Sequence, residues 1–179
     1  LADEIATKRM STDLPEFKEA EDNVSNKMSR LMNVKGKQSV DTFHKRLGKI
    51  MWEHVGMARN EEGLKKAVKE IRELREEFWK DVKVPGKQDE LNPELEKAGR
   101  VADFLELGEL MALDALERKE SCGGHFREEY QTKEGEALRN DQDFTYVSSW
   151  KFAGDDKEPK LNKEELHFEF IELKQRNYK

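Results

Sequence analysis

The chain has 179 residues, of which 39 are acidic and 33 basic, so its formal net charge at pH 7 is −6. Charged residues make up 40% of the sequence and the mean hydropathy is −0.99, which predicts helices with broad solvated faces. This length suits one domain with a core. Because the net charge is negative, the chain as a whole is not attracted to nucleic acid or to an anionic membrane surface.

The amino-terminal residues 1–33 show only weak helical periodicity, and Pro15 interrupts it. They predict a connecting segment with one or two short helices. The sequence opens on Leu1 in the middle of a pattern, without a helix cap. We therefore expect a piece of a longer protein, with a processed whole protein as the alternative.

Three amphipathic helices are predicted next. Apolar residues recur at steps of three and four from Val40 to Val55, from Leu64 to Val82 and from Leu95 to Leu116. Asn60 precedes the second stripe and Asn92-Pro93 precedes the third, and both are start signals for a helix. Short connections make neighbouring helices antiparallel, so the stripes predict an up-down-up bundle.

The pattern changes after Glu120. Loose alternation of apolar and polar residues predicts one strand at 144–150 and another at 166–172, with a turn-rich linker at 154–163 between them. The predicted fold class is therefore mainly α: an antiparallel three-helix bundle of the spectrin-repeat type, with a loop and a small two-stranded β appendage at its carboxyl-terminal end. The predicted layout is a connecting segment at 1–36, the bundle at 37–120, and the loop with its β-ribbon at 121–179.

Sequence signatures of catalysis and cofactor binding are missing. The eleven glycines form neither a dinucleotide fingerprint nor a phosphate loop, and the four histidines lack metal-ligand spacing. The single cysteine, Cys122, excludes an internal disulfide and fits a reducing compartment. A nucleophilic pair of Cys122 and His125 is the alternative to a small cysteine at a helix end, and the rest of the sequence resembles no cysteine–histidine enzyme signature. We therefore assign no catalytic, cofactor-binding or metal-binding residue.

One dense polar segment stands out at 123–130. It places two glycines before His125, Arg127 and Glu128, outside any predicted helix or strand. Glycines permit a tight turn, and an arginine suits a bidentate carboxylate contact. Two interpretations remain open here, a contact site for a partner and a structural tie between bundle and ribbon.

Two blocks of this sequence carry a resemblance to a known family. Glu120–Tyr130 reads Glu-Ser-Cys-Gly-Gly-His-Phe-Arg-Glu-Glu-Tyr, and Met51–Arg59 reads Met-Trp-Glu-His-Val-Gly-Met-Ala-Arg. Both resemble blocks in the carboxyl-terminal domain of succinate dehydrogenase and fumarate reductase flavoprotein subunits, and Arg139-Asn140-Asp141 loosely matches a third. The family's usual arginine is replaced by Cys122, its alanine by Gly124 and its aspartate by Glu129, which indicates a distinct branch.

The resemblance implies a helical domain whose parent enzyme interconverts succinate and fumarate. The parent would bind FAD in an upstream domain and pass electrons to an iron–sulfur subunit. It would lie on the cytoplasmic face of the membrane through partner subunits, without inserting itself and without binding nucleic acid. The chain alone is then expected to be inactive, and His125, Arg127 and Glu128 are expected to contact the upstream domain.

Two alternatives stand beside this interpretation. The bundle pattern alone would suffice for a stand-alone helical interaction module, although a spacer has no reason to contain the segment 121–130. Within the family, L-aspartate oxidase is similar to these enzymes and has the same kind of terminal domain.

Overall fold

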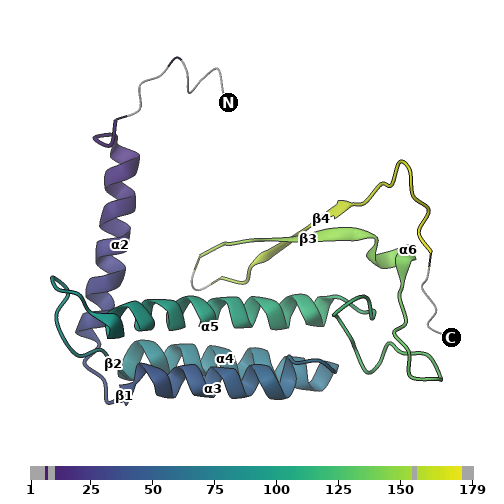
Figure 1. Ribbon diagram of the computed structural model, residues 1–179, viewed down its shortest axis with the longest axis horizontal. Coiled ribbons are helices and arrows are strands. Elements are labelled where there is room, and N and C mark those ends of the chain that lie inside the picture. Colours follow the sequence, from purple (N-terminus) through teal and green to yellow (C-terminus); the bar gives the residue numbers. More distant parts are fainter. Residues whose placement is uncertain (1–6, 8–10, 155–156, 175–179) are drawn as a thin grey trace. The chain divides into compact units, whose positions relative to one another are not determined.

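The computed structural model describes residue 7, residues 11–154 and residues 157–174. Helices dominate, and a two-stranded antiparallel ribbon follows them, so the predicted fold class is confirmed (Figure 1). In chain order the elements are α2 (Pro15–Asn33), β1 (Gln38–Ser39), α3 (Val40–His54), α4 (Glu61–Asp81), β2 (Val82–Lys83), α5 (Pro93–Glu117), α6 (Asp141–Phe144), β3 (Tyr146–Lys151) and β4 (Lys160–Glu165).

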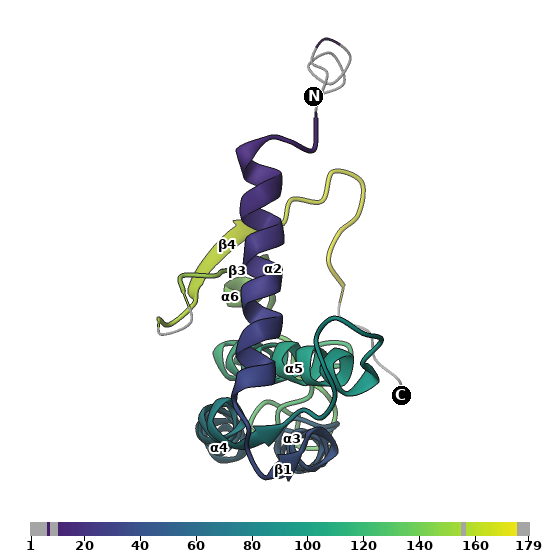
Figure 2. The same cartoon turned by 90° about the vertical axis from the view of Figure 1, so that its left-hand side faces the viewer.

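The described residues belong to two compact units, and each long bundle helix contributes one part to each unit. The first unit comprises 1–47 and 73–106, and the second comprises 48–72 and 107–179. Within each unit, portions of α3, α4 and α5 lie side by side (Figures 1 and 2).

The bundle helices begin at the residues whose side chains can cap them. The Oδ1 atom of Asn60 accepts the N–H of Gly63 at 2.8 Å, and the Oδ1 atom of Asn92 accepts the N–H of Leu95 at 3.1 Å. Both oxygens satisfy amide protons that the first helical turn leaves unpaired. These two starts were predicted from the sequence and are confirmed.

The first unit is held together by apolar side chains. Phe43 of α3 and Phe78 of α4 are fully buried, and their ring centroids lie 5.3 Å apart in an edge-to-face arrangement. The other buried apolar residues of this unit are Leu31, Val40, Leu47, Leu74, Val82, Leu95, Ala98, Val101, Ala102 and Leu105.

A short parallel ladder in the first unit was not predicted. Gln38 of β1 pairs with Val82 of β2, and the N–H of Gly36 donates to the Val82 carbonyl at 3.0 Å. A Cβ atom at position 36 would lie 1.9 Å from the Asp81 carbonyl carbon, so only glycine fits there. Each strand of this ladder is only two residues long, which is too short for an alternating pattern to appear in the sequence.

Residues 15–33 form one continuous helix, α2, rather than one or two short ones. Pro15 occupies the first helical turn, where its missing N–H costs nothing, and so it starts the helix instead of interrupting it. Arg30 of α2 stacks on Trp79, with its Cζ atom 3.9 Å from the ring centroid, and this contact anchors α2 within the first unit.

In the second unit, the ribbon of β3 and β4 is attached to α5 by polar contacts. Trp150 Nε1 donates to Asp114 Oδ1 at 2.7 Å, and Lys163 Nζ lies 3.1 Å from Glu117 Oε1. Tyr146 supplies a buried apolar side chain at the start of β3. A lone ribbon is only marginally stable, so these contacts explain how it persists.

The second strand lies at Lys160–Glu165, so the prediction of a strand at 166–172 and a turn-rich linker at 154–163 is wrong there. Five of the six β4 side chains are exposed, and such a strand needs no alternation of apolar residues. The alternating residues after it are solvent-exposed, with Phe170 at 89% and Ile171 at 71%. Among the described residues, no helix is both long and apolar enough to cross a membrane.

Candidate functional site

The dense polar segment folds into a tight turn at the carboxyl-terminal end of α5. The N–H of Cys122 donates to the carbonyl of His125 at 2.8 Å, and the reverse bond measures 3.0 Å. Gly123 has a φ of +58°, a left-handed conformation that glycine adopts without strain. The predicted glycine turn is therefore present.

The turn pairs with the connection between α3 and α4. Arg59 donates its N–H to the Phe126 carbonyl at 3.1 Å and accepts the N–H of Glu128 at 2.8 Å through its own carbonyl. These bonds form a short parallel bridge between Arg59 and Arg127. The two sequence blocks that carry the family resemblance therefore meet in space.

The side chain of His125 has both ring nitrogens engaged. Arg59 Nη1 lies 2.9 Å from Nδ1, and because a guanidinium can only donate, Nδ1 is the acceptor. The ring proton is then on Nε2, which donates to the Arg118 carbonyl at 2.9 Å. Burial, together with the charges of Arg59, Arg127 and Arg118, lowers the pKa of His125 below its usual 6.5, so the ring is neutral at pH 7.

Arg127 is 1% exposed and reaches the last turn of α5. Its Nη1 donates to the Ala115 carbonyl at 2.8 Å and to the Leu116 carbonyl at 3.3 Å. Its Nε donates to Glu129 Oε2 at 3.1 Å. Helix carbonyls at this end have no intrahelical partner and carry partial negative charge. The guanidinium of Arg127 therefore stabilises them both by hydrogen bonding and by its positive charge.

Two carboxylates cover the amino-terminal end of α4. Glu128 Oε2 accepts from Asn60 Nδ2 at 2.7 Å, and Glu129 Oε1 accepts the backbone N–H of Glu61. Partial burial opposes ionisation of Glu129, but this backbone bond and Arg127 outweigh it and lower the pKa of its carboxyl. The positive end of the α4 dipole acts in the same direction.

Two further buried polar residues, Glu120 and Ser121, hold the segment in place through hydrogen bonds. Glu120, 2% exposed, accepts from Arg118 Nε at 2.9 Å and from the N–H of Asn140 at 2.8 Å. Ser121 Oγ accepts the N–H of Arg127 at 2.8 Å and donates to the Arg127 carbonyl at 3.2 Å. Each buried polar atom named here has a partner, which a low-dielectric interior requires.

The third motif element, 139–141, forms its own ion pair. Arg139 Nη2 lies 2.6 Å from Asp141 Oδ1, and Asn140 Oδ1 accepts the N–H of Asp143 at 3.2 Å, which caps α6. This element joins the network through the bond from Asn140 to Glu120.

The three candidate contact residues differ in exposure. Arg127 is buried, His125 is half-buried and Glu128 is exposed. All three lie in one network with Arg59 and Glu120, for which the sequence predicted no contact role. Periodicity could not reveal those two; the only sequence signal was their presence in the two motif blocks.

Among the described residues, Cys122 is not paired with an activating base, and no cluster of metal ligands is found. His125 cannot activate Cys122, because its Nδ1 and Nε2 atoms are engaged by Arg59 and by the Arg118 carbonyl. No group of three or more histidine, cysteine or acidic side chains in the described part of the chain could hold a metal ion. The geometry is that of a hydrogen-bonded polar turn that connects the end of α5 to the connection between α3 and α4.

A protein-family model described as the carboxyl-terminal part of the fumarate reductase flavoprotein matches residues 44–178. The chain is also similar to the fumarate reductase flavoprotein subunit of Helicobacter pylori, with 34% identity over 146 residues. This alignment covers 82% of the chain and 20% of that subunit.

Two further similarities, one in sequence and one in fold, were found. An uncharacterized FAD-dependent oxidoreductase of Methanocaldococcus jannaschii is 35% identical over 117 residues, covering 65% of this chain and 21% of that protein. A solved quinol–fumarate reductase with menaquinol molecules superposes with a TM-score of 0.76 at 24% identity, covering 94% of this chain and 28% of that one. The chain thus spans about a fifth of the length of the Helicobacter and Methanocaldococcus relatives.

Proposed function

Because this chain belongs to the family of fumarate reductase flavoprotein carboxyl-terminal domains, we propose that its parent enzyme is an FAD-dependent oxidoreductase that interconverts fumarate and succinate. The observation that carries this proposal is the family match over 44–178, joined to 34% identity with a fumarate reductase flavoprotein subunit. The same membership favours this function over a stand-alone helical module.

The hollow in the first unit does not itself fit FAD. Its pyrophosphate needs a glycine-rich turn at a helix amino terminus or a cluster of cations. The hollow in the first unit, of about 490 Å³, instead contains the carboxylate of Glu21 as its charged side chain. A carboxylate repels phosphate, so this hollow is not the flavin site. The family resemblance implies that FAD would bind in the remainder of the parent protein, and no chemical step is assigned to these residues.

The role of the chain is then structural. Residues 1–36 would connect to the preceding flavin domain, residues 37–120 would form the bundle, and residues 121–179 would form the loop and ribbon. The polar network supports a structural role for the loop. Backbone pairing with Arg59 holds it to the connection before α4, and hydrogen bonds from buried Arg127 hold it to the end of α5.

The segment 121–130 would contact the flavin domain. Glu128 is exposed and His125 is half-buried, so they would make the contact directly, while buried Arg127 would hold the turn in shape. Because hydrogen bonds hold the backbone of the segment in place, the exposed carboxylate of Glu128 offers a preorganised partner for a cation.

Partner subunits follow from the same family membership. An iron–sulfur subunit would accept the electrons, and the assembly would lie on the cytoplasmic face of the membrane through its other subunits. The exposed apolar residues that follow β4, Phe170 and Ile171 among them, support a protein contact at this end of the chain.

Capture of the native protein tests this proposal. An antibody raised against the chain should retrieve from source cells a yellow protein several times heavier than 21.0 kDa, with a flavin absorption spectrum. A colourless protein near 21.0 kDa would contradict it.

A variant of the full-length flavoprotein tests the contact. Glu128→Ala should weaken assembly of the holoenzyme and lower turnover, whereas Glu134→Ala, an exposed glutamate in the neighbouring loop, serves as the matched control. His125→Ala and Arg127→Ala should lower both further, because they also loosen the turn. Unchanged assembly and turnover in all three variants would refute the contact.

A further inference from the structure

Helix α2 carries a seam of the kind that packs along another helix. Its seam residues recur at alternating steps of three and four, the spacing that keeps one stripe facing one partner helix. They are Leu14, Phe17, Glu21, Val24, Met28 and Leu31.

Only the carboxyl-terminal end of this seam is covered within the first unit. Leu31 is 2% exposed, and the contacts of Arg30 with Trp79 and of Lys27 with Asp103, at 2.5 Å, fix this end in place. The seam is therefore continuous with the core at one end.

The rest of the seam is open. Leu14 is 39% exposed, Phe17 48% and Val24 59%, although each side chain is apolar. Figures 1 and 2 show that this part of α2 runs away from the helices of its own unit. A row of exposed large apolar side chains along one helix face marks a contact surface.

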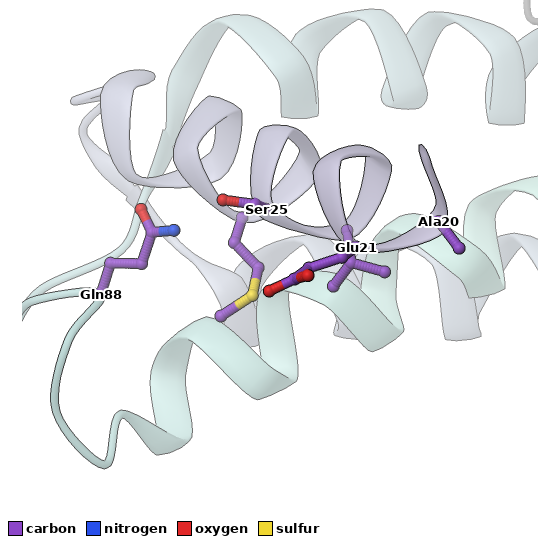
Figure 3. A pocket seen from close by; sticks show the side chains of 6 residues that line it. Ala20, Glu21, Ser25 and Gln88 are labelled. Carbon is purple, nitrogen blue, oxygen red and sulfur yellow. The ribbon is translucent and has the colours of Figure 1, made fainter. Parts of the chain in front are cut away.

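A hollow of about 490 Å³ lies directly on the open seam. Its walls are Ala20, Glu21, Val24, Ser25 and Met28 of α2, and Gln88 from the connection between α4 and α5. Figure 3 shows Glu21 and Gln88 reaching into it from these two elements. Ser29 Oγ donates to Gln88 Oε1 at 3.0 Å, and this bond holds the side chain of Gln88 against α2. The hollow is thus an open depression on the seam, on which side chains of a partner could rest.

We propose that the α2 seam is the docking site for one amphipathic helix from the rest of the flavoprotein polypeptide, which places apolar side chains on Phe17 and Val24 and a basic side chain against Glu21. This inference rests on the proposed function. The relatives are about five times longer than the stretch matched here, so they have ample chain to supply such a helix. Glu21 determines the charge of the partner side chain that faces it, because a carboxylate inside a seam needs a cationic partner once water is excluded.

A second copy of this chain is a poorer occupant. Two-fold pairing of the open stretch, which is centred near residue 20, would bring Glu21 of one copy next to Glu21 of the other. Glu16, Glu19 and Asp22 lie on the same stretch and add like charge. Like charges close together cost free energy, so the seam favours a basic partner.

Thiol labelling of the full-length flavoprotein tests the docking. Val24→Cys places a thiol in the seam, and Asn26→Cys places one on the opposite face of α2 as the matched control. Peptide-resolved mass spectrometry separates both from native Cys122. In the native holoprotein, maleimide should label position 24 at least about tenfold more slowly than position 26, and unfolding should abolish the difference. Equal native rates would overturn the docking.

The charge requirement has its own test. In the Val24→Cys background, Glu21→Lys should speed labelling of the seam thiol several-fold, whereas Glu19→Lys on the opposite face should not. No effect of Glu21→Lys would overturn the basic contact, and protection that depends on protein concentration would assign the seam to a second copy instead. Flavin content is read on the same sample. Fast seam labelling in a protein that retains its flavin rejects the docking alone, whereas a flavin-free protein rejects the proposed function.

Discussion

The first unit and the segment 118–130 of the second unit bury different kinds of side chain. In the first unit the fully buried side chains are apolar, as Phe43 and Phe78 are, whereas in the segment they are Glu120, Ser121 and Arg127. Apolar packing is non-directional and depends on filled volume. A buried polar network depends on each partner being present, because every lost partner leaves another atom unsatisfied.

This difference separates two ways of building a domain. The bundle core can tolerate a swap between apolar residues of similar volume, while the segment should fail when one hydrogen-bonding atom is removed. Substitutions in the core and in the segment therefore have different expected effects.

The largest effect is expected in the apolar core. Phe78→Ala removes a fully buried ring and leaves a cavity beside Phe43, so the free energy of unfolding should fall by about 3–5 kcal/mol. Urea denaturation followed by circular dichroism measures this loss. Phe78→Leu should cost clearly less, and a loss below about 1 kcal/mol for the alanine variant would show that the core is not packed as described.

A smaller but more localised effect is expected at Arg127. Arg127→Met keeps the length of the side chain but leaves the Ala115 carbonyl and Glu129 without their donor, at a cost of about 2–3 kcal/mol. Hydrogen exchange should accelerate at the amides of Arg59 and Glu128, whose hydrogen bonds join the α3–α4 connection to the segment, and not in the first unit. Unchanged exchange at these two amides would show that the network does not hold the segment.

The pH dependence of the segment should follow His125. Its pKa in the folded protein lies below the unfolded value of about 6.5, so the neutral ring stabilises the fold fully above that pH. The contribution is lost as the pH falls below 6.5 towards the folded pKa, where the ring gains a proton and Nδ1 can no longer accept from Arg59. The urea midpoint should therefore drop between pH 7.5 and 5.5, and His125→Gln should flatten this slope. An identical slope in the variant would exclude His125 as the cause.

The smallest effect is expected at an exposed ion pair of the first unit. Hydrogen bonds from Arg46 and Gln38 lower the pKa of Glu77 to about 2, so its contribution is present above pH 4.5 and lost as the pH falls towards 2. Because Arg46 and Glu77 are both well exposed, Glu77→Gln should cost only about 0.5 kcal/mol, and less in high salt. A carboxyl titration by NMR with a midpoint near 4.5 would contradict the pairing.

The sequence was informative where structure depends on periodicity or on caps. The apolar stripes predicted the bundle helices, and Asn60 and Asn92 predicted two of their starts. It was misleading at β4, because an exposed strand such as Lys160–Glu165 carries no alternation, while the alternating residues that follow it are exposed and form no strand.

The polar network could not be derived from spacing. Arg59 and His125 are 66 positions apart and belong to different parts of the chain, so only the folded backbone brings the guanidinium to the ring. The resemblance of the two blocks to one family marked both residues without indicating that they touch.

Electron uptake by the native captured protein tests the proposed function most directly. If the chain belongs to an enzyme that interconverts fumarate and succinate, the protein should oxidise a reduced viologen dye only when fumarate is present, or reduce a dye only when succinate is present. A flavin-containing protein that does neither would contradict the account.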